Sequence, residues 1–559
     1  NENVRILING RPSALAGFGG TDALRQLPAE AIEKVEVITS PSARYDAEGT
    51  AGILNIVLRK EKTLGLNGSL QFITGYPAQA GLTGNINIRT DKFNIFNTTG
   101  LRYRASPGNA MFDNQYLPRT VTDPDTGTTT TVNPEFDRTL ETRKYDRKSR
   151  GLNTNLGFEY FLNPTSSITT AVFYRVSDDN DETTNITEDF QPLTSLQNRR
   201  LREEKELEDD NNFQVSVNYI NQFDKEGKEL TADFQWETSQ ETQTAFIEEA
   251  NTFPTNMQLP AEDITEIEDQ TRFLAQVDFV LPIGDKAQFE AGYRGTFLKT
   301  TTDYELLEQA TTNGPFVRND SISNVFAFTQ NINALYTQYG NKFGAFSFLF
   351  GLRLETTELI GNVAGADVAS DSDFSFNFDK DYIGLFPTLN LTYEINTREN
   401  ITLGYNRRIN RPRGFFINPF PSRSSEANIF QGNPDLDPAY ASAFDLGYLK
   451  RWKKLTLTAS IYYQYETDAF ERVQENTGLL TPNGIPIIRT IPINLATNQR
   501  IGAEAGALYN LARWLRINGS FNFFRFNSEV FTLTSSRLAN KSSNENSISH
   551  LGNSTLIRF

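Results

Sequence analysis

A short polar turn near the start of the chain carries the residue types best suited to buried ionic contacts. Its members are Arg44, Tyr45, Asp46 and Glu48, followed by Gly49 and Gly52. Guanidinium and carboxylate groups form strong, charge-assisted hydrogen bonds with opposite charges on a facing surface. Glycine lets the backbone turn without a Cβ clash. We therefore predict that ion pairs hold this turn against another surface, and a direct role in substrate binding or gating is the alternative.

The composition argues against catalysis and against a transition-metal centre. The chain has no cysteine and a single histidine, His550, so it can form neither a thiolate site nor a histidine cluster. His550 lies outside any nucleophile elbow, and no glycine-rich phosphate loop opens a helix. The net charge of −16 argues against nucleic acid as a partner. We predict that the protein is not an enzyme and needs no cofactor.

Two acidic runs have the ligand type that calcium prefers, which is carboxylate oxygen. They are Asp178, Asp179, Asp181 and Glu182, and the pair Asp371 and Asp373. Most acidic runs are simply solvated. We therefore predict no metal site, with calcium binding by these runs as the open alternative.

The elements around the polar turn predict a small α+β unit. Residues 35–39 and 53–58 have the pattern of strands on either side of the turn, and residues 3–10 form an earlier strand. Short helices are expected at residues 22–27 and 29–33. About 60 residues are too few for a full core. The unit therefore needs a partner surface elsewhere in the chain.

From residue 64 onward, apolar and polar residues alternate with the period of a strand. Residues 82–89, 213–219 and 455–465 show the pattern clearly. Segments of about ten residues with one apolar face fit strands that cross a bilayer, and the aromatic content of 12 % fits interface girdles. The mean hydropathy is −0.46, and no apolar run reaches the length of about 18 residues that predicts a transmembrane helix.

Connection lengths distinguish a barrel from a soluble sandwich, whose strands would also alternate. Short turns are expected at residues 89–93, 162–166, 223–228, 281–286, 339–343, 394–400, 450–454 and 510–514. Long polar connections are expected at residues 106–148, 178–210, 239–270, 301–322, 356–381, 411–437, 467–497 and 527–549. Short and long connections alternate, so one end carries tight turns and the other large loops. We predict an all-β transmembrane barrel with about 18 visible strands.

A polar barrel lumen is the partner surface that the first unit lacks. Arg44, Asp46 and Glu48 would face this lumen and pair with charges on the wall. The candidate wall partners are Arg89, Glu237, Arg294 and Arg353. The predicted arrangement is a small domain held inside the barrel.

Two later stretches, residues 403–420 and 428–448, add a polar arginine patch and an Asn-Pro turn. Their characteristic residues are Arg407, Arg408, Asn410, Arg411, Pro412, Asn433, Pro434, Leu436 and Pro438. Together with the first polar turn, they resemble TonB-dependent outer-membrane receptors, especially those of the Bacteroidota. The Asn-Pro turn is expected to clamp the entry of a strand rather than to bind a ligand.

The resemblance implies a domain division. Residues 1–62 would be the C-terminal part of a plug domain, and residues 63–559 the barrel. The family's barrel closes with roughly 22 strands. We therefore expect the last strands to be missing, and a smaller barrel is the alternative. The chain opens inside a strand and shows no signal peptide at Asn1, so further residues are expected upstream.

Several aromatic residues gather near the second signature. They are Phe415, Phe416, Phe420, Phe430 and Tyr440. They could form a platform for an apolar or sugar-like ligand or contact a partner, and an outer interfacial girdle is the alternative. Residues 199–210 mix both charge signs densely and are expected to form a mobile or partner-contacting outer loop.

By this resemblance, the protein imports a scarce nutrient such as a siderophore, cofactor, glycan fragment or peptide across the outer membrane of a Gram-negative bacterium. Its partners would be outer-membrane lipid and an inner-membrane TonB-type protein that pulls on the plug. The alternative is a receptor-like barrel that serves as a structural subunit of an assembly for secretion, barrel insertion or surface-lipoprotein handling. A surface lipoprotein or other outer-membrane subunits would then be its partners. A TonB box upstream would favour import.

Overall fold

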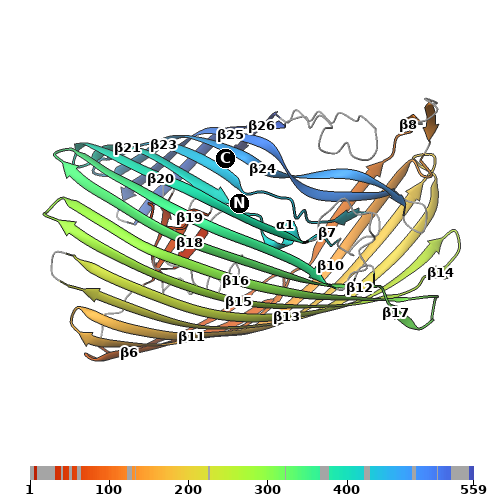
Figure 1. Cartoon of the computed structure of the whole chain (residues 1–559), viewed down its shortest axis with the longest axis horizontal. Coiled ribbons are helices and arrows are strands. Elements are labelled where there is room, and N and C mark those ends of the chain that lie inside the picture. Colours follow the sequence, from red (N-terminus) through yellow and green to blue (C-terminus); the bar gives the residue numbers. More distant parts are fainter. Residues whose placement is uncertain are drawn as a thin grey trace.

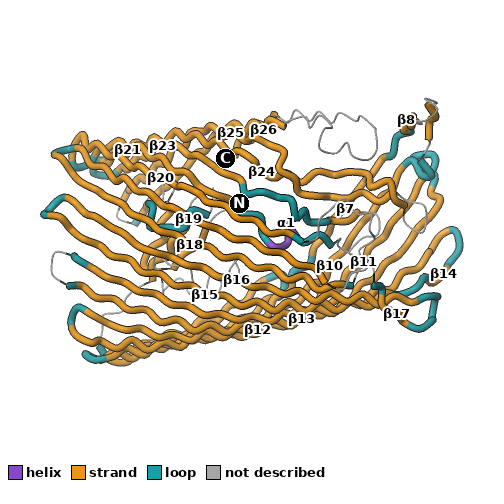
Figure 2. The backbone as a smooth tube through the Cα atoms, in the orientation of Figure 1, coloured by secondary structure: helices purple, strands orange, loops and turns teal. Residues whose placement is uncertain are grey.

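The computed structural model is a long barrel of tilted strands with a small sheet inside it (Figure 1). It describes residues 5–8, 32–38, 42–48, 53–58, 64–122, 129–132, 134–223, 227–320, 323–364, 377–420, 428–480, 486–512, 514–530 and 553–558. Strands make up most of the backbone in Figure 2. Among the described residues, no helix is long and apolar enough to cross a membrane.

The small sheet comes from the start of the chain. In it β1 (Arg5–Ile8) runs parallel to β3 (Ile53–Leu58), and β2 (Ile32–Ile38) runs antiparallel to β3. The helix predicted for residues 22–27 lies outside the described residues. The helix predicted for residues 29–33 is wrong at its end, because Ile32 begins β2. Gly49 and Gly52 also lie outside the described residues.

The barrel strands follow one another around the wall. In chain order they are β4 (Gly65–Gly75), β5 (Gln79–Arg89), β6 (Phe93–Ala105), β7 (Gly108–Gln115), β10 (Arg138–Asn163), β11 (Ser166–Phe190), β12 (Leu196–Gln222), β13 (Glu229–Phe253), β14 (Met257–Gln258), β15 (Glu262–Ile283), β16 (Ala287–Gln309), β17 (Phe316–Arg318), β18 (Asn324–Phe343), β19 (Phe346–Ala364), β20 (Phe378–Asn396), β21 (Glu399–Asn410), β22 (Asn428–Phe430), β23 (Ala439–Arg451), β24 (Leu455–Leu480), β25 (Pro486–Ala512), β26 (Leu515–Val530) and β27 (Asn553–Arg558). A separate hairpin pairs β8 (Arg119–Thr122) with β9 (Thr129–Val132).

The number of strands matches the expectation from the alternating pattern. The segments β14, β17 and β22 are short, and β7 continues β6 along the same neighbour, β10. Without these, the described barrel has 18 strands, with β27 next to β4 in the ring. The expectation of further strands, and the domain boundary after residue 62, stay predictions.

The two faces of the wall differ in the way that a bilayer requires. Phe234, Phe273 and Leu335 point outward and are exposed, whereas Arg294 and Arg353 point into the lumen and are buried. Because successive side chains on a strand alternate between faces, one pattern supplies both an apolar exterior and a polar interior. The all-β transmembrane barrel predicted from the sequence is confirmed.

The predicted long loops are largely wrong, because the strands continue beyond the bilayer. The strands β10, β11, β12 and β13 have 26, 25, 27 and 25 residues, against about 9–11 needed to span a bilayer. Outside lipid, both faces of a strand can be polar. The alternation of apolar and polar residues is therefore lost there, although main-chain pairing continues. Residues 199–210 accordingly lie in β12, where Arg199 pairs with Glu188 of β11. They do not form the loop that we expected.

One predicted turn is displaced. The strand β18 runs through residues 339–343, and the chain reverses at residues 344–345. Gly344 has a φ of 58°, a backbone conformation that favours glycine.

The wall is split between β20 and β21 toward the large-loop end. Their pairing stops at Thr388 and Asn406, although both strands continue. The next residue of β20 is Pro387, which has no N–H to donate to a ladder. Beyond Asn406, β21 still pairs with β23 on one edge, but it no longer pairs with β20 on the other. The segment that fills the gap belongs to the candidate site.

Candidate functional site

The inner turn, residues 42–48, is ordered by its own backbone. Tyr45 N donates to Ser42 O at 3.1 Å, and Glu48 N donates to Asp46 Oδ1 at 3.2 Å. The second bond is the local side-chain bond that aspartate makes in turns. The other carboxylate oxygen of Asp46 faces the wall.

Arg44 anchors one end of the inner turn to β15. Its Nη2 lies 3.4 Å from Asp278 Oδ2, and Asp278 also accepts hydrogen bonds from Gln276 and Tyr336. Burial alone would lower the pKa of Arg44, but Asp278, Tyr336, Glu290 and Tyr45 together outweigh burial, and the pKa is raised. Burial also raises the pKa of the neighbouring phenol of Tyr45. Arg44 therefore stays charged and paired.

Asp46 anchors the middle of the turn to β16. Its Oδ2 lies 3.3 Å from Arg294 Nη2, and both side chains are buried. Ala43 packs onto β19 at Gly351, where an added Cβ would come within 2.7 Å of the Ala43 Cβ. A glycine at this position therefore lets the turn reach the wall.

The turn also completes the split wall beside β21. Ile409 N donates to Ala47 O at 3.0 Å, and Arg408 Nη2 donates to Glu48 O at 2.7 Å. Glu48 and Ile409 form a parallel β-bridge. Ala47, Ile409 and Phe386 of β20 pack together as a small apolar cluster. The turn thus occupies the position beside β21 that β20 leaves open.

A buried charge group joins the turn to the residues that follow β21. Glu355 accepts hydrogen bonds from Arg353 and Arg411, and all three side chains are at most 2 % exposed. Ala47 N lies 3.5 Å from the same carboxylate, and Arg411 Nη1 lies 3.9 Å from Glu48 Oε2. Two guanidinium groups share one carboxylate here, so the loss of Glu355 would remove the nearest counter-charge of two buried cations.

A strap crosses the lumen beyond Arg411. We define it as residues 411–420 and 428–438, which include the short helix α1 (Gly414–Ile417) and β22. Ile417 and Leu436 of the strap pack on Phe326, Phe328 and Leu359 of the inner wall. The strap is therefore packed against the inner wall of the barrel.

The far part of the strap contacts β10 across the barrel and the nearby β25. Asn428 Nδ2 donates to Glu141 Oε2 on β10 at 2.7 Å, and β22 pairs in parallel with β25. Asn433 donates to Pro492 O at 3.1 Å, and Asp437 N donates to Asn494 Oδ1 at 2.8 Å. The Asn-Pro turn thus makes hydrogen bonds to β25 at the entry of β23, and stays proposed as a strand clamp.

One group of the predicted aromatic residues lies on the strap and contains Phe415, Phe416 and Phe430. Phe415 stacks on Phe430 with centroids 4.4 Å apart, and Phe416 lies 5.8 Å from Phe470. Arg472 covers the Phe416 and Phe430 rings at 5.2 and 5.8 Å. Phe415 is 63 % exposed and is a candidate platform.

The remaining sequence-predicted residues take supporting places. Tyr440 lies apart from the other aromatics, between Arg407 and Phe386, while Phe420 packs beside the apolar strap cluster. Pro412, Pro434 and Pro438 are buried, and Asn410 is half-buried.

Of the four wall partners expected for the turn, two pair with other wall residues instead. Arg89 lies 4.0 Å from Glu159, and Glu237 accepts from Asn212. Arg294 contacts the turn directly, and Arg353 does so through Glu355. The sequence reasoning missed Asp278 and Glu355. Both occupy lumen-facing positions of the alternating pattern, which is the signal that could have found them.

The acidic run on β11 does not converge on one point. Asp178 pairs with Arg150, and consecutive residues of a strand point to opposite faces. Among the described residues, no group of three or more His, Cys, Asp or Glu side chains could hold a metal ion. Asp371 and Asp373 lie outside the described part of the chain.

These features define a class of protein: an outer-membrane barrel whose lumen holds a small plug. Residues 221–557 match the outer membrane protein beta-barrel family, and residues 1–53 match the TonB-dependent receptor plug domain. The chain belongs to this barrel family and is a TonB-dependent receptor. The inner turn is therefore called the plug turn from here on. The likeness to Bacteroidota receptors in particular stays a prediction.

Individual relatives are distant. A probable TonB-dependent siderophore receptor, PirA of Acinetobacter baumannii, is 37 % identical over 86 residues, which is 14 % of this chain and 11 % of that protein. The chain thus matches only about a tenth of the length of this curated relative.

Solved structures show the same fold over most of the chain. The siderophore receptor PirA from Pseudomonas aeruginosa is 15 % identical, with a TM-score of 0.54 over 94 % of this chain and 79 % of that one. The ferric yersiniabactin uptake receptor FyuA from Yersinia pestis is 13 % identical, with a TM-score of 0.54 over 94 % and 71 %. The copper transporter OprC is 10 % identical, with a TM-score of 0.60 over 94 % and 72 %.

Proposed function

We propose that the protein imports a scarce nutrient across the outer membrane, driven by a TonB-type partner that pulls on the plug. The observation that carries the proposal is the position of the plug turn, which fills the split beside β21 through Ala47 and Glu48. A domain held by a few hydrogen bonds and ion pairs is stable at rest, yet it can be displaced locally by force. No covalent chemistry or cofactor is required.

The contacts suggest how displacement of the plug reaches the outer side. Arg411 contacts Glu355 and Glu48 and also begins the strap. Withdrawal of Glu48 removes a carboxylate from this group, and withdrawal of Ala47 removes a donor to Glu355. The strap, whose other end contacts β10 and β25, then loses part of its support at the base. Displacement of the plug is thereby coupled to movement of the strap.

The substrate class stays broad. The relatives named above include siderophore receptors and a copper transporter. The stacked pair of the exposed Phe415 and the half-buried Phe430, with Arg472 beside it, would suit an apolar or aromatic solute with negative charge. We include siderophores, cofactors, glycan fragments and peptides as candidates.

Nutrient-limited growth tests the proposal. A deletion strain and its complemented parent are grown on single sources of iron, copper, cofactor, glycan or peptide. Import predicts a growth defect on one source. The wild-type gene restores growth in a strain that has the TonB-type partner and does not restore it in a strain that lacks this partner. Normal growth on every source, together with a general envelope defect, would support the structural-subunit alternative.

A further inference from the structure

The barrel wall contains a slit between β20 and β21, and both of its ends are held. On the side of the short turns, the ladder closes it with the pair Thr388 and Asn406. Toward the large-loop end, Lys380 Nζ of β20 donates to Leu436 O of the strap at 3.0 Å. The plug turn lies between these two points. The slit is therefore a short, bounded gap in an otherwise paired wall.

The ladder register shows which residue of β20 belongs opposite the contact of the plug turn on β21. From Glu394 to Thr388, β20 pairs with β21 residue by residue. The same register carried on would place Leu385 opposite Ile409. Ile409 N donates to Ala47 O instead, on the edge of β21 that faces β20. Because an antiparallel pair exchanges its N–H and C=O groups, Ala47 O occupies the acceptor position that Leu385 O would have in a continuous wall.

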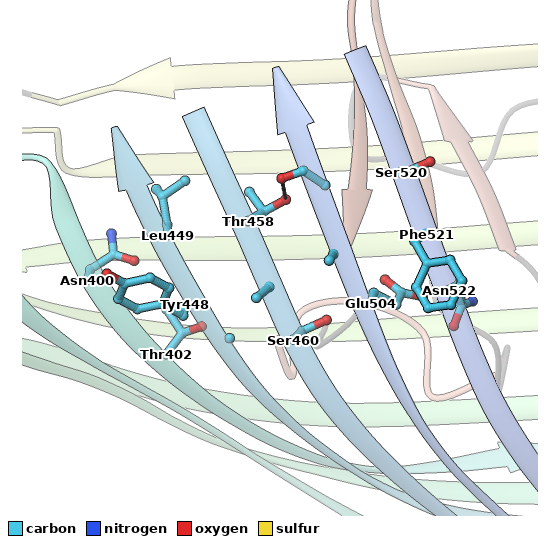
Figure 3. A pocket seen from close by; sticks show the side chains of 14 residues that line it. Asn400, Thr402, Tyr448, Leu449, Thr458, Ser460, Glu504, Ser520, Phe521 and Asn522 are labelled. Carbon is cyan, nitrogen blue, oxygen red and sulfur yellow. Dashed lines mark hydrogen bonds between the residues drawn. The ribbon is translucent and has the colours of Figure 1, made fainter. Parts of the chain in front are cut away.

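The strand β21 is fixed on its other edge, so β20 is the strand that can move. β21 pairs with β23 over its whole length, from Glu399 to Asn410. Figure 3 shows part of this paired wall from close by, with Thr402 of β21 beside Tyr448 of β23. Beyond Thr388, among the described strands, β20 has a ladder partner on one edge, which is β19. A shift of β20 by one strand spacing, about 5 Å, would bring it to β21.

An open slit would be unfavourable once the plug turn has left. Ile383 and Leu385 lie on the outer face of β20 and are 67 % and 48 % exposed, as expected for residues that face lipid. The lumen side of the slit carries the buried charges of Glu355 and Arg411. Main-chain groups without a partner are costly next to lipid. Pairing of β20 with β21 would satisfy these groups and separate the charges from the membrane.

Pro387 explains why β20 does not pair here while the turn is in place. In the continued register it lies opposite Arg407, and it has no N–H to donate. That pair would therefore lack one of its two hydrogen bonds. The plug turn, in contrast, receives bonds from both Ile409 N and Arg408 Nη2. The apolar cluster around Ala47 adds to the stability of the bound turn.

We propose that β20 and the plug turn compete for one edge of β21. While the turn is bound, Ala47 O accepts the N–H of Ile409. When the turn leaves, Leu385 O takes its place and β20 closes the wall. Pro387 is the positioning residue that keeps this edge for the turn. The exchange goes beyond the import function proposed above and follows release of the turn by any cause.

A disulfide between the two exchanging residues reports the closed wall, because the chain has no cysteine of its own. With the turn in place, two strand spacings separate residues 385 and 409 by about 10 Å. After the exchange their Cα atoms would lie about 5.5 Å apart, within the range that a disulfide allows. Leu385→Cys with Ile409→Cys is therefore the test pair. Leu391→Cys with Leu403→Cys is the matched control, since these residues are already paired in the ladder.

Both pairs are oxidised in outer-membrane vesicles, with the turn anchored and with the turn released by Arg44→Ala and Asp46→Ala. The yield of the 385–409 disulfide should rise at least about fivefold on release, whereas the 391–403 disulfide should form equally in both backgrounds. The control pair also verifies that the ladder is intact in the released protein. An unchanged or lower yield of the 385–409 disulfide, with the control pair formed, overturns the exchange.

Pro387→Ala tests the positioning role with the turn still anchored. The substitution gives β20 the missing N–H, so β20 should compete better for β21. The yield of the 385–409 disulfide should rise, and hydrogen exchange at residues 42–48 should accelerate about fivefold. Pro282→Ala, near the short-turn end of β15, should change neither quantity. If Pro387→Ala behaves as this control does, Pro387 does not reserve the edge.

The exchange and the import function fail in different ways. If the growth test finds no imported nutrient but the 385–409 disulfide forms on release of the turn, import fails and the exchange stands as a property of the wall. If a nutrient is found but the disulfide does not form on release, the exchange fails and import stands.

Discussion

The backbone N–H of Ile409 in β21 donates to the carbonyl of Ala47 in the plug turn, 3.0 Å away. This bond joins a residue of the barrel wall to a residue more than 360 positions earlier, at the point where β20 has separated from β21. The plug is thus part of the hydrogen-bonded wall at this point, besides being enclosed by it. Its removal leaves an unpaired strand edge.

Ile409→Pro should loosen the plug without breaking β21 from β23. Proline removes the N–H that Ala47 accepts, and a net hydrogen bond contributes about 1 kcal/mol. Hydrogen exchange at residues 42–48 should accelerate about fivefold, and Ile409→Val, which keeps the N–H, should leave it unchanged. Equal exchange in both variants would show that this bond does not hold the turn.

Glu355→Gln should destabilise the base of the strap. The substitution keeps the shape but leaves Arg353 and Arg411 as buried cations without their carboxylate, a loss of about 3–5 kcal/mol. Proteolysis in the strap and exchange at residues 411–417 should increase strongly. Glu358→Gln on the same strand serves as the control, since Glu358 accepts from Asn331 away from this group. A Glu355 variant as protected as its control would contradict the account.

Gly351→Ala tests the close approach of the plug turn to β19. The new Cβ would lie 2.7 Å from the Ala43 Cβ, so the turn has to shift or the wall has to yield, at a cost of about 1–3 kcal/mol. Sensitivity of cells to a large antibiotic that the closed barrel excludes should rise. At Gly519 an added Cβ meets nothing within 4 Å, so Gly519→Ala should behave as wild type. Equal sensitivity of the two variants would argue against contact at Gly351.

Phe415→Ala tests the aromatic platform. Loss of the exposed partner of the stacked pair should weaken binding of an apolar or aromatic substrate about tenfold, measured as the Kd on whole cells. Phe350→Ala, which removes an exposed ring on the lipid-facing wall, should leave the Kd unchanged. If both variants bind as wild type, Phe415 belongs to the wall's aromatic surface and not to a platform.

Local pattern was enough to predict the barrel, because each strand carries its own period of two. The inward position of Arg294 and Arg353 followed from the same pattern. The alternating pattern could not predict the length of β10–β13. Residues 178–210 are polar on both faces, as a loop would be, although their main-chain pairing continues.

The contact between Ala47 and Ile409 depends on register between distant segments, which one sequence does not specify. Pro387 was a local sign that β20 could not pair throughout, since proline interrupts a ladder. Its meaning became clear only with the plug turn in place beside β21. The pairing of Arg44 with Asp278 was likewise missed, because several lumen-facing carboxylates were equally available to it.

The central claim is that the plug turn must leave β21 for a solute to pass, and a reversible crosslink tests it most directly. Glu48 and Ile409 are β-bridge partners, so cysteines at both positions fall within the Cα separation of about 4.4–6.8 Å that a disulfide allows. With the nutrient identified by growth, uptake in cells carrying Glu48→Cys and Ile409→Cys should stop on oxidation and return on reduction. Surface binding should stay unchanged, and neither single variant should respond to oxidation. Uptake that continues at the same rate with the crosslink formed would contradict the account.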